Sequence, residues 1–204
     1  MAKVQIVFYS LYGHIYHMAN AIAEGARSVP GTQVEMYQVA ETLPQEVLQK
    51  MGAVEAKKAF AHVPIADPKK LNEADAIILG TGTRFGSATA QMQTFLDATG
   101  GHWNSGGLIG KVASAFTSTA SQHGGQETTL MNLYTFFIHQ GMVISGVPYA
   151  AKELLNMAEL TGGTPYGAST ITGPKGERMP SANELAIARF QGKHVAELAT
   201  KLAK

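Results

Sequence analysis

The chain has 204 residues, of which 45% are hydrophobic and 15% are charged, whereas about 25% charged residues is usual in a soluble domain. This composition predicts one folded domain over residues 1–204, and the low charged fraction predicts that an oligomer covers part of its surface. Sixteen Lys and Arg against 15 Asp and Glu give a net charge of +1, which argues against a strongly basic nucleic-acid-binding protein and a strongly acidic carrier.

The first apolar stretch ends at Tyr9 and is too short for a signal sequence or a membrane span. No later segment approaches the roughly 18 uninterrupted apolar residues that a spanning helix needs. We therefore expect a cytoplasmic protein without stable membrane insertion.

Short apolar runs alternate with segments of helical spacing along the chain. Such runs are typical of strands buried in a parallel sheet, and five strands are expected at residues 4–9, 34–39, 76–79, 112–116 and 142–144. Helices are expected around residues 15–26, 92–96 and 130–138, and from a capping box at residues 181–184 to the C-terminus. The alternation predicts an open, doubly wound α/β sheet, in which ligands bind beyond the carboxyl ends of the strands.

Three stretches are longer than ordinary connections between elements. They cover about residues 41–73, 97–111 and 145–180, and the last of them contains Gly173-Pro174-Lys175-Gly176. Long loops of a compact domain usually serve a function or an interface, so we expect the same here.

The sharpest motif follows the first strand and opens directly into the first helix. It reads Ser10-Leu11-Tyr12-Gly13-His14-Ile15. Backbone amides and a Ser hydroxyl at a helix N-terminus can bind an anion, and the helix dipole strengthens this site. The motif lacks the Lys of a nucleoside triphosphate loop, so a monophosphate held by neutral donors is the better candidate. The six residues alone are equally consistent with an ordinary strand–helix turn capped by Ser.

Two further loops follow strands at the same expected edge of the sheet. Residues 80–86 space their glycines as G-x-G-x-x-x-G, one residue longer than a dinucleotide fingerprint, but they suit the lining of a flat ring. Residues 117–126 are rich in hydroxyl groups and glycine. Three such loops at successive carboxyl ends predict one shared binding crevice.

Other chemistries find little support in the sequence. The absence of Cys excludes disulfides, thiolate catalysis and Cys-ligated zinc or clusters. His14 and His17 lie three residues apart without a carboxylate cluster, so no metal site is expected. No G-x-S-x-G elbow is present for Ser hydrolysis. Trp103, in a Gly-rich loop, is consistent with simple packing or with a wall for a planar substrate.

Taken together, the motifs resemble the flavodoxin-like family, and more closely the WrbA-type NAD(P)H:quinone oxidoreductases. The resemblance covers essentially the whole chain and rests on residues 10–15, 83–86, 95–97 with 100–103, 123–127, 141–143 and 162–168. It implies a five-stranded parallel sheet of order 2-1-3-4-5, with helices on both faces and inserted loops.

The resemblance also implies a site for non-covalent FMN. Ser10 to Ile15 would hold the phosphate, and Thr83, Arg84 and Phe85 would line the isoalloxazine ring. The third wall would consist of Ser118, Thr119, Ala120, Ser121, Gln122 and His123.

Three further residues receive roles from the resemblance. Tyr12 is similar to a residue near the nicotinamide cofactor, and Trp103 to one that contacts the quinone. His139, the candidate catalytic residue, matches a position beside the flavin that some members reach from a neighbouring subunit. The chain departs from the family pattern at Gly82, where relatives have Pro, in a 118–123 loop one residue longer, and at Gln140, which replaces a second His.

The expected function is two-electron reduction of quinones to hydroquinones by NADH or NADPH through FMN. One open flavin face used twice, with hydride passing through N5, predicts ping-pong kinetics, and the family implies a homotetramer arranged as a dimer of dimers. The main alternative is a flavodoxin-type one-electron carrier. The net charge of +1 and the long insertions argue against it, because such carriers typically dock through an acidic surface. A scaffold protein that retains FMN is a third possibility.

Overall fold

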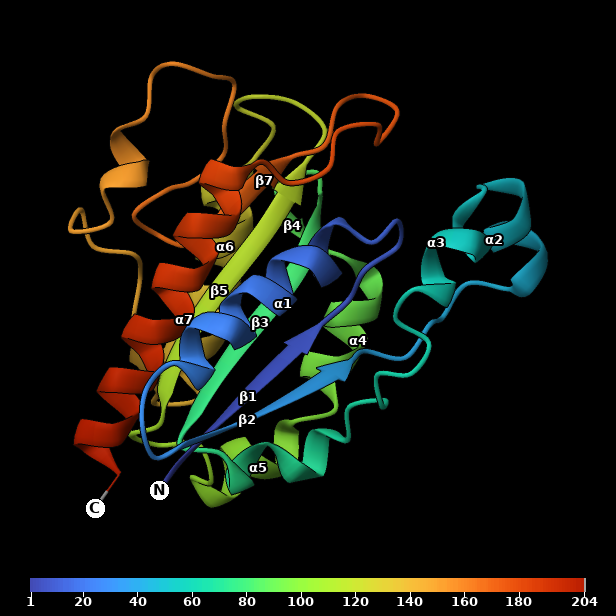
Figure 1. Cartoon of the computed structure of the whole chain (residues 1–204). Coiled ribbons are helices and arrows are strands. Elements are labelled where there is room, and N and C mark those ends of the chain that lie inside the picture. The colour runs from blue at the N-terminus through green and yellow to red at the C-terminus, as the bar shows by residue number, and fades with distance from the viewer. Residues whose placement is uncertain (204) are drawn as a thin grey trace.

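A mostly parallel sheet forms the centre of the chain, whose residues 1–203 are described by a computed structural model (Figure 1). Its main path has the order β2-β1-β3-β5-β6. These strands are β1 Ala2–Phe8, β2 Thr32–Gln38, β3 Ala76–Arg84, β5 Val112–Thr119 and β6 Val143–Ile144. They coincide with the five predicted strands and, numbered among themselves, run 2-1-3-4-5, so the predicted fold class is confirmed.

Two short strands were not expected from the sequence. β4, Ser87–Ala88, turns back antiparallel on the end of β3. β7, Ser169–Ile171, runs parallel to the carboxyl half of β5, whereas β6 pairs with the amino half. The fifth position of the sheet is therefore divided between two segments, with residues 145–168 inserted between them.

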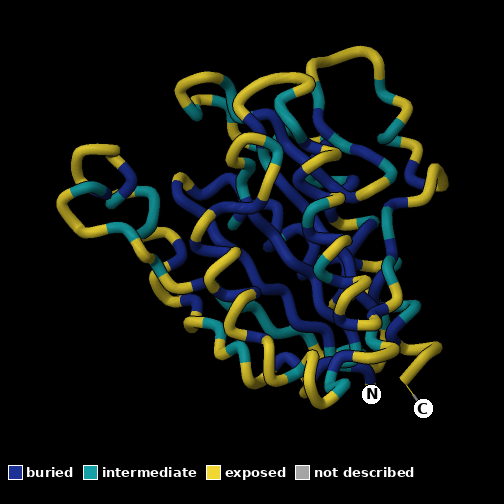
Figure 2. Tube along the Cα trace, turned by 180° about the vertical axis from the view of Figure 1, so that it is seen from behind, coloured by how far each residue is buried: buried dark blue, intermediate teal, exposed yellow. Residues whose placement is uncertain are grey.

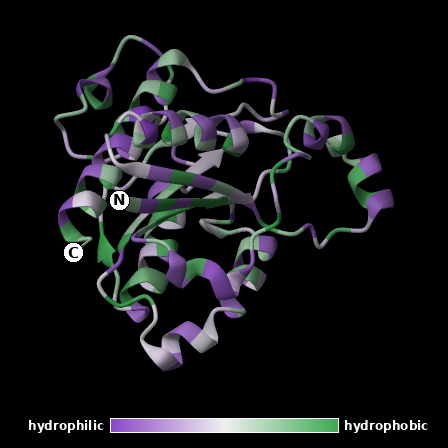
Figure 3. Ribbon diagram, turned by 60° about the horizontal axis from the view of Figure 1, so that its bottom comes forward, coloured by the Kyte–Doolittle hydropathy of each residue, from purple (hydrophilic) through white to green (hydrophobic). Residues whose placement is uncertain are grey.

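Helices cover both faces of the sheet, as predicted. α1, His14–Arg27, and α7, Ala182–Leu202, lie together on one face (Figure 1). α4, Ala90–Asp97, and α6, Gln126–His139, cover the other. Figure 3 shows purple and green alternating along the outer helices, as expected for amphipathic helices with one buried side.

Each face of the sheet has its own hydrophobic core, because successive side chains of a strand point to opposite faces. Val4, Ile6 and Phe8 pack with α1 and α7, whereas Val7 and Tyr9 belong to the core under α4 and α6. Figure 2 shows the central strands as buried and the peripheral loops as exposed. β2 is mostly half-buried, in agreement with its predicted place near an edge.

The long connections contain short elements of their own. The first holds α2 Gln45–Lys50, α3 Ala53–Lys58 and the 3₁₀ helix η1 Pro68–Glu73, and α2 and α3 form an arm that projects from the domain (Figure 1). The others hold α5 Gly100–Ser105 and the 3₁₀ helix η2 Lys152–Leu155. Within residues 1–203, no helix has the length and apolarity required to cross a bilayer.

Candidate functional site

A cleft of about 430 Å³ lies at the carboxyl ends of β1, β3, β5 and β7. Parallel strands bring their carboxyl ends to the same edge of a sheet, so loops far apart in sequence meet there. The residues that line the cleft are Tyr9 to Tyr12, His14, Ile15, Gly82 to Arg84, Thr89, Ser118 to Ala120 and Thr172 to Gly176. The loops after β1, β3 and β5 were predicted to share a crevice, and the structure brings all three together.

The loop after β1 lines the cleft and carries unpaired backbone donors. The Ser10 hydroxyl oxygen accepts hydrogen bonds from the amides of Gly13 at 3.1 Å and Tyr16 at 3.4 Å. Gly13 has a φ of 92°, which favours glycine and turns the chain into α1. The remaining amides, those of Leu11, Tyr12, His14 and Ile15, form no hydrogen bond within residues 1–203.

This donor set fits the phosphate of FMN. The free amides lie at the N-terminus of a 14-residue helix, where the helix dipole favours an anion. The Ser10 oxygen already accepts two hydrogen bonds, so its own proton is free to be donated to a ligand. We call residues 10–15 the phosphate cradle; all of its residues except Gly13 line the cleft.

His14 joins the phosphate cradle to the loop after β7. Its ring Nε2 lies 3.0 Å from the carbonyl oxygen of Gly176, and only 5% of the residue is exposed. Burial lowers the pKa of the imidazole, and His17 acts in the same direction, although the Gly176 carbonyl opposes both. The imidazole is therefore neutral at pH 7, with its proton on Nε2 where it donates to the carbonyl.

The loop after β3 is a tight hairpin. Thr83 pairs with Ala88 and Arg84 with Ser87, which leaves Phe85 and Gly86 as a two-residue turn with φ values of 54° and 80°. The Thr83 hydroxyl oxygen accepts hydrogen bonds from Gly86 N at 3.1 Å and from the Thr129 hydroxyl at 2.8 Å. Thr83 and Arg84 line the cleft, as predicted for the second wall.

Phe85 stands at the tip of this hairpin and, unlike Thr83 and Arg84, is not part of the wall of the cleft. Its side chain is fully exposed, at 104% of the reference area, and does not line the cleft of this single chain. A positive φ costs a bulky residue about 1–3 kcal/mol and often marks a functional position. The hairpin therefore holds an apolar ring beside the cleft at the expense of backbone strain.

The loop after β5 is only partly in the cleft. Ser118, Thr119 and Ala120 line it, and Thr119 is fixed by a hydrogen bond from its hydroxyl to Ser121 O at 2.8 Å. Ser121, Gln122 and His123 are exposed and lie outside the cleft lining. Gln126, at the start of α6, donates to the Thr119 hydroxyl at 3.1 Å and ties this wall to the helix.

Tyr9 and Tyr12 both line the cleft but differ in exposure. Tyr12 is 40% exposed, and its hydroxyl donates to Met51 O on the projecting arm at 3.2 Å. Tyr9 is buried and donates to the Glu41 carboxylate at 3.0 Å, and Glu41 pairs with Lys57 at 3.0 Å. Burial raises the pKa of the Tyr9 hydroxyl, with the Glu41 charge as a further cause.

His139 and Trp103 lie far from the cleft of their own chain. α6 begins beside the third wall and ends at His139, and its 14 residues span about 20 Å. His139 lines a separate groove between α4 and α6. Trp103 is 64% exposed on α5, near the amino ends of the strands (Figure 1). Their predicted roles require that a second copy of the chain brings them to the cleft.

The segment Thr172 to Gly176 lines the cleft but was not among the predicted site residues. It follows β7, so it occupies the same position relative to the sheet as the three predicted loops. The Gly-Pro-Lys-Gly sequence of the last long connection was its only visible signal. We call residues 172–176 the β7 turn.

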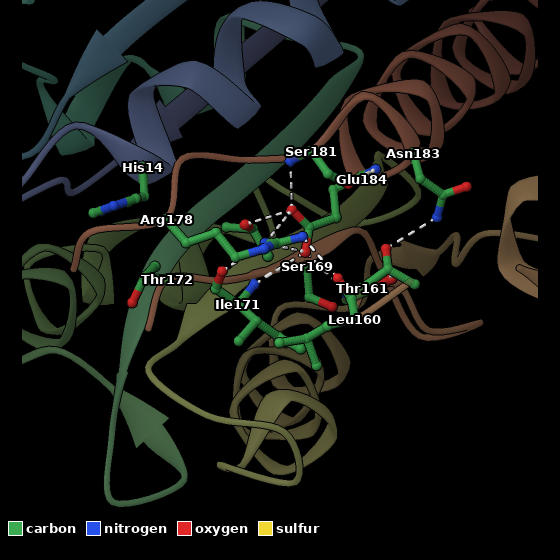
Figure 4. A network of polar contacts seen from close by, with 12 residues as sticks. His14, Leu160, Thr161, Ser169, Ile171, Thr172, Arg178, Ser181, Asn183 and Glu184 are labelled. Carbon is green, nitrogen blue, oxygen red and sulfur yellow. Dashed lines mark hydrogen bonds and ion pairs between the residues drawn. The ribbon is translucent and has the colours of Figure 1, made fainter. Parts of the chain in front are cut away.

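A buried carboxylate anchors the β7 turn to α7. Glu184 is fully buried and accepts hydrogen bonds from the amides of Gly162 at 2.8 Å and Ile171 at 3.1 Å. The Arg178 guanidinium pairs with it at 2.9 Å, and Figure 4 shows this side chain extending toward Glu184. The predicted capping box is present too, with Ser181 N 2.7 Å from the carboxylate. The partners satisfy a charge that burial alone would make costly.

The comparisons with known proteins identify the family of the chain. Residues 10–154 match the family described as NADPH-dependent FMN reductase. The chain is 60% identical over 200 residues to a Geobacter metallireducens protein named NAD(P)H dehydrogenase (quinone), covering 98% of each. It is 58% identical over 202 residues to a protein of that name from Aromatoleum aromaticum, covering 99% of this chain and 98% of the relative.

A solved structure shares the fold over nearly its full length. It is the flavodoxin, WrbA-like protein from Agrobacterium tumefaciens, with a TM-score of 0.67, 24% sequence identity and 99% of each chain covered. The resemblance predicted from the sequence is thereby confirmed. The chain belongs to the NADPH-dependent FMN reductase family, in which it groups with the enzymes named NAD(P)H dehydrogenase (quinone).

Proposed function

We propose that this protein binds FMN non-covalently in the cleft and reduces quinones to hydroquinones with NADH or NADPH. The observation on which the proposal rests is the set of four unpaired amides in the phosphate cradle, placed where the carboxyl ends of β1, β3, β5 and β7 meet. The names of the relatives, NAD(P)H dehydrogenase (quinone), support the same reaction.

The proposed reaction is balanced as NAD(P)H, a proton and a quinone giving NAD(P)⁺ and a hydroquinone. Bound FMN would supply the redox chemistry, accepting hydride at N5 and delivering it to the quinone. The role of the protein is to hold the phosphate with the cradle and to line the ring with Thr83, Arg84 and residues 118–120. We expect both substrates to use the side of the cleft beside the half-exposed Tyr12 in turn, which would give ping-pong kinetics.

We further propose that the active form is a homotetramer, a dimer of dimers. His139 and Trp103 lie at the amino-terminal end of the sheet in their own chain and can meet a cleft only across an interface. Ile109 and Ile138, exposed at 70% and 65%, add apolar surface to the same region. Exposed apolar residues of this kind favour association between copies. His139 of a neighbouring copy would then donate a proton or stabilise the reduced ring.

An anaerobic titration of the purified protein with NADH tests the proposal. We expect a flavin spectrum that bleaches with one equivalent of NADH and recovers with one equivalent of benzoquinone. Initial rates at several fixed quinone concentrations should give parallel double-reciprocal lines. Intersecting lines would contradict the shared open face, and negligible benzoquinone turnover without an added reductase would favour the one-electron carrier.

A further inference from the structure

We propose that Lys175, on the β7 turn, is a phosphate-binding residue that supplies the positive charge missing from the neutral phosphate cradle. The inference rests on the proposed function, since the ligand is the terminal phosphate of FMN. It extends the binding site to a segment that follows β7 and lies 160 residues after the cradle in the sequence.

The β7 turn covers the phosphate end of the cleft and not the ring end. The Gly176 carbonyl accepts the hydrogen bond from His14, a residue of the phosphate cradle, at 3.0 Å. A Cβ placed on Gly176 would lie 3.5 Å from the same imidazole, so the turn is in direct contact with the start of α1. Lys175 is the neighbouring residue in this turn and lines the cleft.

Among the cations that the structure describes around the cleft, Lys175 is the one available to a ligand at the phosphate end. Arg84 is the last residue of β3, in the hairpin with β4, and its guanidinium donates to Thr83 O at 3.1 Å. Lys57 does not line the cleft, and its ammonium is already engaged, because it pairs with Glu41 at 3.0 Å and donates to the Ser10 carbonyl oxygen at 3.3 Å. Among the described residues, no acidic side chain lines the cleft. A phosphate dianion bound there would attract the nearest mobile ammonium group strongly.

The backbone of the β7 turn is fixed while the Lys175 side chain is not. Gly176 N donates to Gly173 O at 3.1 Å, and Arg178 N donates to Thr172 O at 2.8 Å. Arg178 in turn pairs with the buried Glu184. The Lys175 ammonium forms no ion pair within residues 1–203, although Glu177 accepts from its backbone amide at 2.8 Å. The Lys175 side chain is exposed at the edge of the cleft and has no competing charged partner in the described part of the chain, so it is available to a phosphate bound there.

Titration of the flavin-free full-length protein with FMN and with riboflavin tests this assignment, because riboflavin lacks the phosphate. We expect Lys175→Met to weaken FMN binding about tenfold or more, as for loss of a charge-assisted hydrogen bond, and to leave riboflavin affinity unchanged. Lys175→Arg should restore most of the FMN affinity. Lys69→Met, which removes an exposed Lys of η1, is the matched control and should behave as the wild type.

Flavin fluorescence quenching gives each dissociation constant, and the measurement is repeated at two ionic strengths. The FMN affinity of the wild type should fall more steeply with salt than that of Lys175→Met. Equal weakening of FMN and riboflavin, or unchanged FMN binding in Lys175→Met, would overturn the role of Lys175. Failure of the wild type to bind either flavin would instead refute the proposed function, and the Lys175 assignment with it.

Discussion

His14 couples the phosphate cradle to the β7 turn through a single hydrogen bond. Its imidazole must stay neutral to remain buried, because an imidazolium ion in this position would lose its hydration without gaining a carboxylate partner. The stability of this contact therefore depends on pH, and burial of the ring determines whether acid strengthens or weakens it.

The pH dependence follows from the lowered pKa of His14. The unfolded chain takes up the proton near the ordinary pKa of 6.5, before the folded chain does. The free energy of unfolding should therefore fall as the pH drops through about 6.5, and the contribution of His14 to this slope should fade as the pH rises above 7. Urea unfolding of the flavin-free protein at pH 7.5 and 5.5 measures this difference, which should be smaller in His14→Gln.

The matched control for that comparison is His62→Gln, which removes an exposed imidazole. It should leave the loss of stability between the two pH values as large as in the wild type. Equal losses in the wild type and His14→Gln would show that burial of this ring does not set the slope.

At the scale of elements, the packing of α1 against α7 determines where the phosphate cradle lies. The two helices approach so closely that a Cβ on Gly192 would come within 1.9 Å of Ile22 O, and one on Gly25 within 1.9 Å of Arg189 O. A backbone oxygen cannot move aside as a flexible side chain can. Both glycines thus allow α1 to lie against α7, with its N-terminus at the cleft.

We therefore expect Gly192→Ala to lower the free energy of unfolding by about 1–3 kcal/mol, the usual cost of overpacking. The gain of up to about 1 kcal/mol in helix propensity is too small to offset a clash with backbone. Urea unfolding measures the change. Gly100→Ala in α5, where a Cβ would meet nothing within 4 Å, is the control and should be neutral or stabilising. An unchanged free energy of unfolding in Gly192→Ala would mean that α1 and α7 can move apart without cost.

The elements differ in how well the sequence predicts them. β1, β3 and β5 are buried on both faces and read as continuous apolar runs, so their positions were predicted correctly. β7 has three residues and β4 has two, too few for any periodicity to appear. β7 is defined by its pairing with β5 alone, and without it the β7 turn could not be placed at the cleft.

At the scale of the whole molecule, a sequence motif does not say where in space its residues lie. The motifs around Trp103 and His139 indicated site residues, but the fold puts both at the opposite end of the sheet from the cleft. These two residues would lie next to the flavin only in an assembly of several chains. No sequence pattern within one chain shows how such chains are arranged. The homotetramer therefore remains a prediction that joins these two residues to the site.

Complementation between two variants tests that arrangement. Gly13→Asp puts a side chain at a φ of 92°, which strains the turn into α1, and adds a negative charge next to the phosphate cradle, so this chain should bind FMN poorly. His139→Ala keeps the cradle but lacks the imidazole. We expect each variant alone to have little quinone reductase activity. When they are co-expressed at equal levels with different affinity tags, random pairing should restore about a quarter of wild-type activity.

The recovered activity depends on where His139 acts. If it acts across an interface, a cradle from a His139→Ala chain meets an intact imidazole on a Gly13→Asp chain, and tandem purification should enrich the active hetero-oligomers. If it acts within its own chain, every site lacks either the cradle or the imidazole, and mixing restores nothing. Full activity of His139→Ala alone would remove His139 from the mechanism, and a monomer in light scattering would exclude the tetramer itself.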